Sequence, residues 1–235
     1  MELQGKKVIV AGSGVSGIGA VTMLGRLGAK IILYDGNNAL TKEEIRAKVP
    51  QGIELEIIIG DLTKEALDGT EIFVVSPGIP RDTLCVKKAE EAGLTIWGEI
   101  ELAYQASKGR LAAITGTNGK TTTTTLAGEI LKSWYASVFV VGNIGIPYTS
   151  IALDTKEDSI TVAEISSFQL ETVWEFAPEV SAILNITPDH LNRHKTMENY
   201  IAIKESITKN QKLGNVCVLN YEDKELRKFG EKLEI

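Results

Sequence analysis

Short apolar runs recur along the whole chain, and each is followed by Gly, Ser, Asn or Asp and then by a helix-like segment. The runs are continuous rather than alternating with polar residues, which is typical of strands buried on both faces of a sheet. Their alternation with helices predicts an α/β fold with parallel sheets. The runs are KVIVAG (7–12), IILYDG (31–36), EIFVVSPG (71–78), LAAITG (111–116), SVFVVGN (137–143), ITVAEIS (160–166), SAILNIT (181–187) and NVCVLN (215–220).

The polar stretch YQASKGR (104–110) separates two series of these runs, so we place a domain boundary near residue 107. A chain of 235 residues, 43% of them hydrophobic, is long enough to bury two cores. We therefore predict one α/β domain at 1–106 and a second at 107–235. Ligands of open parallel sheets bind at the carboxyl ends of the strands, which is where the unusual residues of this chain fall.

Composition excludes several classes of function. The net charge of −6 argues against a broad contact with nucleic acid or with anionic lipid, so an anionic ligand would have to be held locally. Cys85 and Cys217 match no metal-ligand spacing and are expected to be ordinary reduced thiols. No segment approaches the ~18 apolar residues of a membrane span, and the start carries no signal peptide. We expect a soluble, cytoplasmic monomer.

The turn in TGTNGKTTTTT (115–125) places two glycines and a lysine between a predicted strand and a predicted helix. Gly116 and Gly119 let successive N–H groups converge on phosphate oxygens at a helix N-terminus, which carries roughly +0.5 of an elementary charge. Lys120 can neutralise the terminal phosphates, and the Thr121 hydroxyl can bind magnesium. The pattern predicts a triphosphate-binding loop, although its glycines enclose two residues instead of the usual four.

An acidic residue and a histidine follow two later runs. Glu164 ends ITVAE, where a phosphate loop needs an acidic partner for its metal. His190, in NITPDHLNRH, should project over the same edge of the sheet. Its imidazole could contact a metal or a substrate, or it could merely cap the next helix.

Lys204 shares a predicted helix stripe with the apolar residues Met197, Ile201 and Ile207, at steps of three and four residues. Its stem could be buried while the ammonium reaches water. If the whole side chain is buried, its pKa falls and a neutral amine becomes available for chemistry. The sequence leaves both alternatives open.

GSGVSG (12–17) fits the dinucleotide pattern G-x-G-x-x-G, and Asp35 ends the next run eighteen residues after Gly17. One interpretation is a nicotinamide-dependent oxidoreductase. However, the second domain has its own triphosphate loop, and nothing resembles a hydride-transfer site. The same geometry would hold the diphosphate of a UDP-linked substrate, and SPGI (76–79) adds a second small-residue turn at that edge.

Taken together, TGTNGKTT, GNIG (142–145), EISSFQLE (164–171), NITPDHLNRH (185–194) and the helix with Lys204 resemble the Mur ligases, in the family's order. SSFQLE is similar to the branch that adds D-glutamate to UDP-N-acetylmuramoyl-L-alanine in peptidoglycan precursor synthesis. The resemblance covers essentially the whole chain. It implies a Rossmann-like UDP-substrate-binding domain at 1–106 and a P-loop-type central ATP-binding domain at 107–235.

The resemblance also implies roles for individual residues. Thr121 and Glu164 would bind one magnesium ion, and His190 and Lys204 a second, with Lys204 as a carbamate formed with carbon dioxide. These residues and Lys120 would form the catalytic centre. The implied contacts of the ATP phosphates are Gly116, Thr117, Asn118, Gly119, Lys120, Thr121 and Thr122. The implied contacts of the UDP-sugar are Val15, Ser16, Asp35, Ser76, Gly78, Asn143, Ser167 and Gln169.

Family members are about twice as long and have a third, carboxyl-terminal domain. The resemblance therefore implies that this chain lacks that domain and part of the central one, including the adenine-binding and D-glutamate-binding residues. On this basis we expect little ligase activity from the chain alone. Two further alternatives are a non-catalytic nucleotide-binding module and a sister ligase acting on another precursor or on folate. EISSFQLE argues against the sister ligase.

Overall fold

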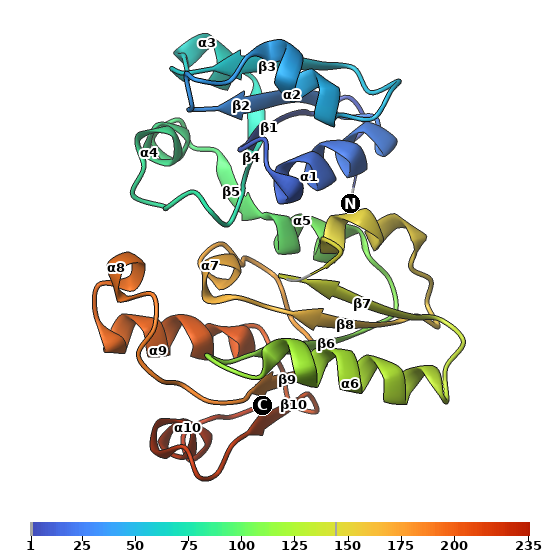
Figure 1. Ribbon diagram of the computed structural model, residues 1–235, viewed down its shortest axis with the longest axis vertical. Coiled ribbons are helices and arrows are strands. Elements are labelled where there is room, and N and C mark those ends of the chain that lie inside the picture. The colour runs from blue at the N-terminus through green and yellow to red at the C-terminus, as the bar shows by residue number, and fades with distance from the viewer. Residues whose placement is uncertain (1, 144) are drawn as a thin grey trace. The chain divides into compact units, whose positions relative to one another are not determined.

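The computed structural model describes residues 2–143 and 145–235, so Ile144 of the GNIG stretch lies outside the described residues. The chain divides into two compact units, one comprising Met1–Ala106 with Thr172–Trp174, and the other Ser107–Glu171 with Glu175–Ile235. Each unit contains one sheet whose described strand pairs are all parallel, as the α/β prediction requires. Figure 1 labels the elements of both units.

The sheet of the first unit has the strand order β3-β2-β1-β4-β5. The chain leaves β1 towards β2 on one side and leaves β4 towards β5 on the other, so the order reverses between β1 and β4. Such a switch point leaves a crevice between the two outgoing loops. The elements are β1 (Lys7–Ala11), α1 (Val15–Arg26), β2 (Lys30–Asp35), α2 (Lys42–Lys48), β3 (Leu55–Ile59), α3 (Lys64–Leu67), β4 (Thr70–Val75), α4 (Leu84–Glu91), β5 (Thr95–Gly98) and α5 (Glu99–Ala106).

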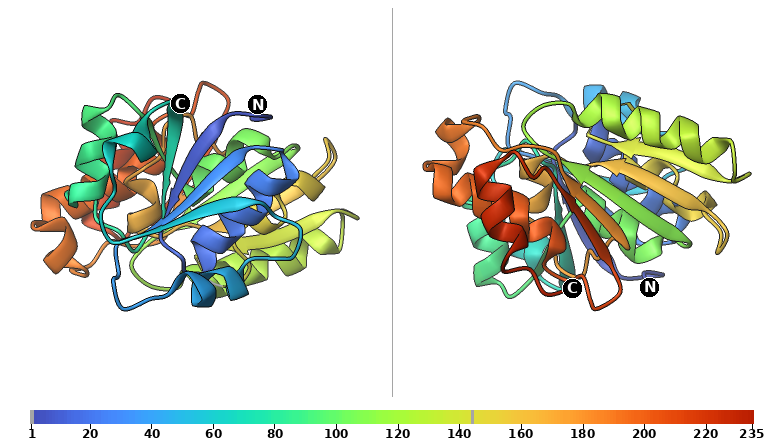
Figure 2. Two further views of the ribbon diagram at one scale, coloured as in Figure 1. Left: turned by 90° about the horizontal axis from the view of Figure 1, so that it is seen from above. Right: turned by 90° about the horizontal axis from the view of Figure 1, so that it is seen from below.

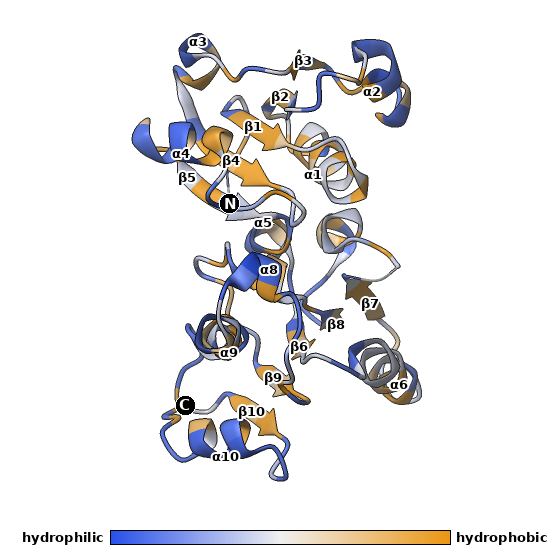
Figure 3. Ribbon diagram, turned by 60° about the vertical axis from the view of Figure 1, so that its left-hand side comes forward, coloured by the Kyte–Doolittle hydropathy of each residue, from blue (hydrophilic) through white to orange (hydrophobic). Residues whose placement is uncertain are grey.

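Helices cover both faces of each sheet, as the two views in Figure 2 show. In the first unit, β1 and β4 are fully or almost fully buried over most of their length, and α1 buries Ala20, Val21 and Leu24. Figure 3 shows β1 and β4 as hydrophobic, whereas α2 and α4 carry hydrophilic residues on their ribbons. Burial on both faces explains why the central strands appear in the sequence as continuous apolar runs.

The sheet of the second unit has the order β10-β9-β6-β8-β7. Strands β6 and β9 are neighbours, and the chain leaves them towards opposite edges, so a second switch point lies between them. The elements are β6 (Arg110–Thr115), α6 (Lys120–Lys132), β7 (Val138–Gly142), η1 (Tyr148–Ser150), η2 (Ala152–Asp154), β8 (Ile160–Glu164), α7 (Ser167–Leu170), β9 (Val180–Ile183), α8 (Leu191–His194), α9 (Met197–Glu205), η3 (Ser206–Thr208), β10 (Val216–Leu219) and α10 (Lys224–Gly230).

Side-chain caps fix the starts of several helices. Thr41 forms a capping box with Glu44 at α2, and Ser166 forms one with Gln169 at α7. Thr196 and Asp223 cap α9 and α10 in the same way, by accepting main-chain N–H groups of the first turn.

All eight predicted runs contain strands, but the structure adds β3 and β5, which were not predicted. Both are edge strands of the first sheet. In β3, Glu56 interrupts the apolar residues, and β5 has only four residues. An edge strand has one neighbour and needs less apolar surface, so its sequence signal is weaker. Among the described residues, no helix has the length and apolar character needed to cross a membrane.

Candidate functional site

The glycine loop of the first unit follows β1 and lies at that unit's switch point. A Cβ on Gly17 would come within 1.8 Å of the carbonyl oxygen of Gly12, so the loop and the start of α1 touch and only glycine fits there. Ser76, after β4, approaches the same loop: its Oγ would lie 2.7 Å from a Cβ on Gly12. In the described part of the chain this buried hydroxyl has no hydrogen-bond partner. It is therefore available to a ligand held by the loop.

Asp35, at the end of β2, holds the glycine loop from the other side. Its Oδ2 accepts hydrogen bonds from Ser13 N at 2.9 Å and Ser13 Oγ at 2.6 Å, and its Oδ1 accepts one from Asn37 N at 3.0 Å. Burial alone would raise the pKa of Asp35, but these hydrogen bonds outweigh it and hold the pKa below its usual range. The carboxylate thus supports the loop, whereas a dinucleotide site needs it for a ribose hydroxyl.

Other predicted sugar contacts of the first unit are open to solvent or lie in turns. Val15, the first residue of α1, is 73% exposed, and Ser16 beside it is half-buried. Gly78 lies in the turn closed by a hydrogen bond from Ile79 N to Ser76 O. These residues border the same crevice as Ser76.

The phosphate loop of the second unit joins β6 to α6. Gly119 occupies the N-cap position with φ of 81°, a left-handed conformation that favours glycine. Lys120 folds back over the loop, and its Nζ donates to Gly116 O at 3.0 Å and to Thr117 O at 2.9 Å. In the described chain, the N–H groups of the first helical turn have no acceptor, as expected at a helix start. These groups belong to Gly119, Lys120, Thr121 and Thr122.

Lys204 reaches the same loop from α9. Its side chain is only 1% exposed, and its Nζ donates to Gly116 O at 2.8 Å and lies 3.5 Å from Thr115 Oγ1. Two lysines therefore share one carbonyl oxygen. Burial, with a smaller contribution from the nearby Lys120 charge, lowers the pKa of Lys204 from 10.5 to about 7. The alternative in which the ammonium reaches water is wrong.

Loop 184–190, which follows β9, is bonded directly to the phosphate loop. Thr117 N donates to Asn185 O, and Asn118 N donates to Asn185 Oδ1, both at 2.9 Å. Asn185 Nδ2 returns a bond to Asn118 O at 3.0 Å. The Thr117 hydroxyl contacts Thr187 N, Thr187 O and the Tyr200 hydroxyl at 3.0 to 3.1 Å. Two of the predicted phosphate contacts, Thr117 and Asn118, are thus engaged with this loop.

Glu164 ends β8, which pairs with β6 so that Glu164 lies opposite Ile114. Its side chain is buried and accepts a hydrogen bond from Asn143 Nδ2 at 3.1 Å, while Asn143 N donates to Glu164 O. The structure therefore brings Glu164 and Asn143 together at the carboxyl edge of the second sheet, beside the phosphate loop. We call this edge the rim. Both residues are sequence-predicted site residues.

His190 is about half exposed and has a left-handed backbone with φ of 50°. Its main-chain N–H donates to Asp189 Oδ1, its Nε2 lies 3.4 Å from Asp189 Oδ2, and its ring packs on Phe168 with centroids 4.8 Å apart. It occupies the N-cap position of α8, yet its side chain makes no cap hydrogen bond. The capping alternative is therefore correct for the position of His190, which caps α8 through its main-chain carbonyl, while the imidazole takes no part in the cap and remains accessible.

His194 is a buried residue that sequence reasoning missed. Its Nε2 lies 3.0 Å from Ser167 Oγ, and its Nδ1 lies 3.5 Å from Glu171 Oε1, a carboxylate that Arg193 holds through two nitrogens. Burial lowers the pKa of His194. Two features of the sequence could have indicated it: His194 lies four residues after His190, and it lies shortly before α9. Ser167 is thus oriented by protein contacts.

Gln169, another predicted sugar contact, has its Oε1 in the α7 capping box, where it accepts from Ser166 N and Ser166 Oγ at 2.9 Å. Its predicted role therefore depends on the remaining amide atoms. Among the described residues, no group of three or more His, Cys, Asp or Glu side chains could hold a metal ion by itself.

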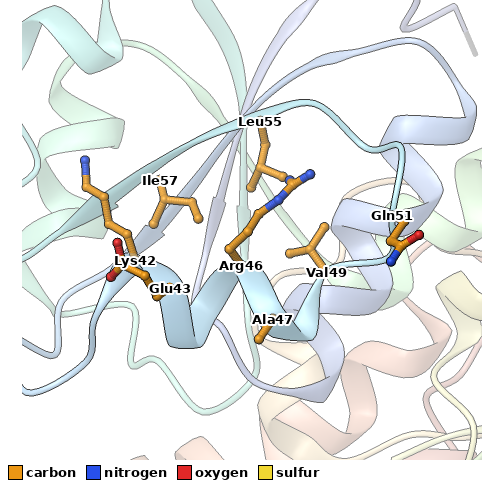
Figure 4. A pocket seen from close by; sticks show the side chains of 8 residues that line it. All are labelled: Lys42, Glu43, Arg46, Ala47, Val49, Gln51, Leu55 and Ile57. Carbon is orange, nitrogen blue, oxygen red and sulfur yellow. The ribbon is translucent and has the colours of Figure 1, made fainter.

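Two cavities of the first unit lie apart from these residues. One, of about 720 Å³, lies between α2 and the edge strand β3 and is lined by Arg46, Val49 and Ile57 among others (Figure 4). The other, of about 1070 Å³, is bordered by α3 and α4. Neither contains a predicted site residue.

The second unit has the features of a nucleotide-binding α/β protein: a glycine-containing strand-to-helix turn, a lysine at the helix start and an acidic residue on the neighbouring strand. The family model described as "Mur ligase middle domain" matches residues 114–234, and "Mur ligase MurD-like, N-terminal domain" matches residues 6–98. The chain belongs to the Mur ligase family.

Two similar curated proteins share the description UDP-N-acetylmuramoylalanine--D-glutamate ligase. The protein from Lachnoclostridium phytofermentans is 58% identical over 97% of this chain and 50% of its own length. The protein from Clostridioides difficile is 44% identical over 99% of this chain and 51% of its own length. The chain thus spans about half the length of the curated relatives it matches.

Solved structures with the same fold are more distant in sequence. The UDP-N-acetylmuramate:L-alanyl-gamma-D-glutamyl-meso-diaminopimelate ligase from Neisseria meningitides matches with a TM-score of 0.58 at 14% identity, covering 97% of this chain and 75% of that one. The UDP-N-acetylmuramate-alanine ligase from Thermotoga maritima matches with a TM-score of 0.54 at 19% identity, covering 94% of this chain and 50% of that one. At these identities the likeness concerns the fold.

Proposed function

We propose that the chain is the substrate- and ATP-binding part of a ligase that adds D-glutamate to UDP-N-acetylmuramoyl-L-alanine during peptidoglycan precursor synthesis. Residues 1–106 bind the UDP-linked substrate, and residues 107–235 bind ATP. The observation that carries this proposal is the helix start at Gly119. There, within the described residues, four N–H groups have no acceptor, and they lie near Lys120 and the buried Lys204. This is a site for a highly charged anion.

Phosphates of ATP accept hydrogen bonds from the N–H groups of Gly119, Lys120, Thr121 and Thr122. The Lys120 ammonium exchanges its two carbonyl partners for the terminal phosphates, which is a stronger, charge-assisted contact. The shape of the loop is set by Gly116, Thr117 and Asn118. Before ATP binds, the carbonyl oxygens of Gly116 and Thr117 therefore hold the Lys120 side chain in place.

Magnesium fits the oxygen donors at the rim. Glu164 is a buried carboxylate whose Oε1 is bonded to Asn143, and in the described chain no partner is found for its Oε2. Thr121 adds a hydroxyl at the helix start, and a hydroxyl with a carboxylate is a set that magnesium prefers. Magnesium supplies charge neutralisation on the phosphates. A second ion at His190 and Lys204 requires Lys204 as a carbamate, because a lysine ammonium cannot be a metal ligand.

The buried amine of Lys204 suits that modification. A pKa of about 7 leaves a substantial neutral fraction at physiological pH, and only the neutral amine can attack carbon dioxide. The neutral amine adds to carbon dioxide, and the new N–C bond gives a carbamate anion with two oxygen donors and releases one proton. Counted from the ammonium form, which first loses a proton to become the amine, a cation becomes an anion and two protons are released. This would explain why a lysine lies within a metal-binding rim.

The reaction begins when the substrate carboxylate attacks the γ-phosphorus of ATP, giving an acyl phosphate and ADP. The amine of D-glutamate then attacks the acyl carbon, loses a proton, and the tetrahedral adduct expels phosphate as the amide forms. The chain contributes positioning and positive charge, which is the main requirement of phosphoryl transfer. No covalent protein intermediate is needed.

The UDP-linked substrate binds at the first switch point. The glycine loop 12–17 suits a diphosphate, as does the Ser76 hydroxyl, which has no partner among the described residues. Val15, Ser16 and Gly78 lie at the border. Asp35 acts by holding the loop. For the second unit taken by itself, the residues proposed to contact the sugar-linked substrate are Asn143, Ser167 and Gln169.

Calorimetric titration of the purified chain tests this proposal. We expect binding of a magnesium–ATP analogue and of UDP-N-acetylmuramoyl-L-alanine, and none of reduced nicotinamide cofactor. Binding of the nicotinamide cofactor without the UDP-sugar would favour the oxidoreductase alternative, which the occupied Asp35 carboxylate argues against. A protein of the relatives' length that begins with this chain should release phosphate only when both the UDP-sugar and D-glutamate are present.

A further inference from the structure

The Thr117 hydroxyl has no capacity left for a phosphate. A threonine hydroxyl donates one hydrogen bond and accepts two. Here Thr187 O, at 3.1 Å, can only accept, so it takes the proton, while Thr187 N at 3.0 Å and the Tyr200 hydroxyl at 3.1 Å fill the acceptor positions. Because an anion can be held only by donation, this side chain cannot bind a phosphate without releasing Thr187.

Asn118 is engaged in a similar way. Its N–H donates to Asn185 Oδ1 at 2.9 Å, and its carbonyl accepts from Asn185 Nδ2 at 3.0 Å. Thr117 N donates to Asn185 O. The main-chain N–H groups of residues 117 and 118 and the Thr117 hydroxyl thus all donate to loop 184–190. In the described part of the chain, no acceptor is found for the N–H groups of residues 119 to 122.

Loop 184–190 needs such support because it ends in a strained residue. His190 has φ of 50°, a region that residues other than glycine seldom occupy, and such strain persists only where the surroundings impose it. Thr187 lies three residues before His190 and is held at both its N–H and its carbonyl by one hydroxyl. The Phe168 ring packs against the His190 ring, with centroids 4.8 Å apart.

We propose that Thr117 is a positioning residue, whose hydroxyl, with the Asn118–Asn185 pair, fixes loop 184–190 to the phosphate loop and so places His190 at the rim. This inference rests on the proposed nucleotide site and deepens it. The inference divides the phosphate loop into two parts. Residues 117 and 118 bind loop 184–190, and residues 119 to 122 bind the nucleotide.

The test uses the histidine signals of the chain, which has two histidines, His190 and His194. The imidazole Cε1–H signals of isotope-labelled protein are recorded without nucleotide or magnesium, and a His194→Asn variant assigns them. We expect Thr117→Val to shift or broaden the His190 signal. Thr117→Ser keeps the hydroxyl and should leave it in place. Thr125→Val, the same change at an exposed position on α6, is the matched control.

An unchanged His190 signal in Thr117→Val would overturn the proposal. If Thr117→Val does not fold, as judged by its amide spectrum, Tyr200→Phe removes one of the contacts to the same hydroxyl. That variant should shift the His190 signal by a smaller amount, and no shift would again overturn the proposal.

A second readout measures ADP affinity by calorimetry in the presence of EDTA. A positioning role predicts that Thr117→Val stays within about twofold of the unmodified chain, because the hydroxyl donates nothing to phosphate. A loss of about tenfold, or 1.4 kcal/mol, would make Thr117 a phosphate ligand and contradict the proposal. If the unmodified chain binds no ADP, the proposed function fails, while the histidine signals still decide the role of Thr117.

Discussion

The two units place their candidate sites at the same topological position but equip them differently. Each site lies where the strand order reverses, between β1 and β4 in one sheet and between β6 and β9 in the other. The first has a glycine loop supported by the Asp35 carboxylate, and a serine hydroxyl for which the described residues provide no partner. The second has a helix start whose N–H groups find no acceptor in the same described ranges, and two lysines on one carbonyl oxygen. Topology therefore provides the crevice, and local charge determines which anion it suits.

The largest expected effect follows from removing the charge of the second site. Lys120→Ala should weaken binding of a magnesium–ATP analogue by at least about 100-fold, since charge-assisted hydrogen bonds contribute about 1.5–3 kcal/mol each. Lys132→Ala is the matched control, because Lys132 lies on the same helix in an exposed pair with Glu129. Calorimetry on both variants measures the difference. Equal affinities would remove Lys120 from the nucleotide site.

The buried lysine should make stability depend on pH. Its folded pKa of about 7 lies below the ordinary 10.5. Between these values the unfolded chain binds more protons than the folded chain, so the free energy of unfolding rises with pH, by at most about 1.4 kcal/mol per unit. The destabilisation by the buried Lys204 is complete below the folded pKa and decreases as the pH rises above that value.

Lys204→Met keeps the length of the side chain and removes the titration. We expect urea midpoints of the unmodified chain to rise between pH values of about 7.5 and 9.5, in buffer free of carbon dioxide, and those of the variant to rise less. The same slope in both proteins would show that Lys204 titrates normally. Added bicarbonate should change the urea midpoint of the unmodified chain and leave that of Lys204→Met unchanged.

A smaller effect is expected at the first site, where Asp35→Asn weakens the support of the glycine loop. The variant should lose about 1–2 kcal/mol of stability at neutral pH, because an amide oxygen accepts the hydrogen bonds of Ser13 less strongly than a carboxylate. The pKa of Asp35 is lowered in the folded chain, so its contribution is present above the unfolded value and is lost as the pH falls through the folded value.

Thermal unfolding of Asp35→Asn at neutral pH and at a pH near 3 measures this. The difference from the unmodified chain should shrink in acid. A difference that does not depend on pH would mean that the carboxylate charge is unimportant to the loop.

The smallest effect should come from the surface. Glu129 and Lys132 form an ion pair at 2.7 Å, with both side chains at least half exposed. Such pairs are worth about 0.2–1 kcal/mol at most, so Glu129→Gln should change the urea midpoint very little. A loss as large as that of Asp35→Asn would show that exposed charge, and not the loop support, dominates the comparison.

The sequence was sufficient for the fold class and for most strands, because central parallel strands are apolar on both faces. It was insufficient for the edge strands β3 and β5, because Glu56 interrupts the apolar residues of β3 and β5 has only four residues. Glu164 and Asn143 could be placed at the rim because both end apolar runs. The burial of Lys204 could not be decided, since periodicity gives the face of a helix and not what covers it.

The sequence also could not show which partner each hydrogen-bond donor of the phosphate loop has. Residues 116–122 are all glycine or polar, and nothing in the order of letters shows that Asn118 pairs with Asn185, 67 residues away. His194 was missed for the same reason, because its contact with Ser167 joins segments 27 residues apart. Such contacts depend on strand order, which brings β9 beside β6.

The central claim is that the two switch points bind two different phosphate-containing ligands independently. The most direct measurement is a calorimetric titration of the chain with UDP before and after saturation with ADP and magnesium. The account predicts one UDP site whose affinity is unaffected by ADP and which survives Lys120→Ala, while ADP binding is lost in that variant. Competition between UDP and ADP for one site, or loss of both in Lys120→Ala, would contradict it.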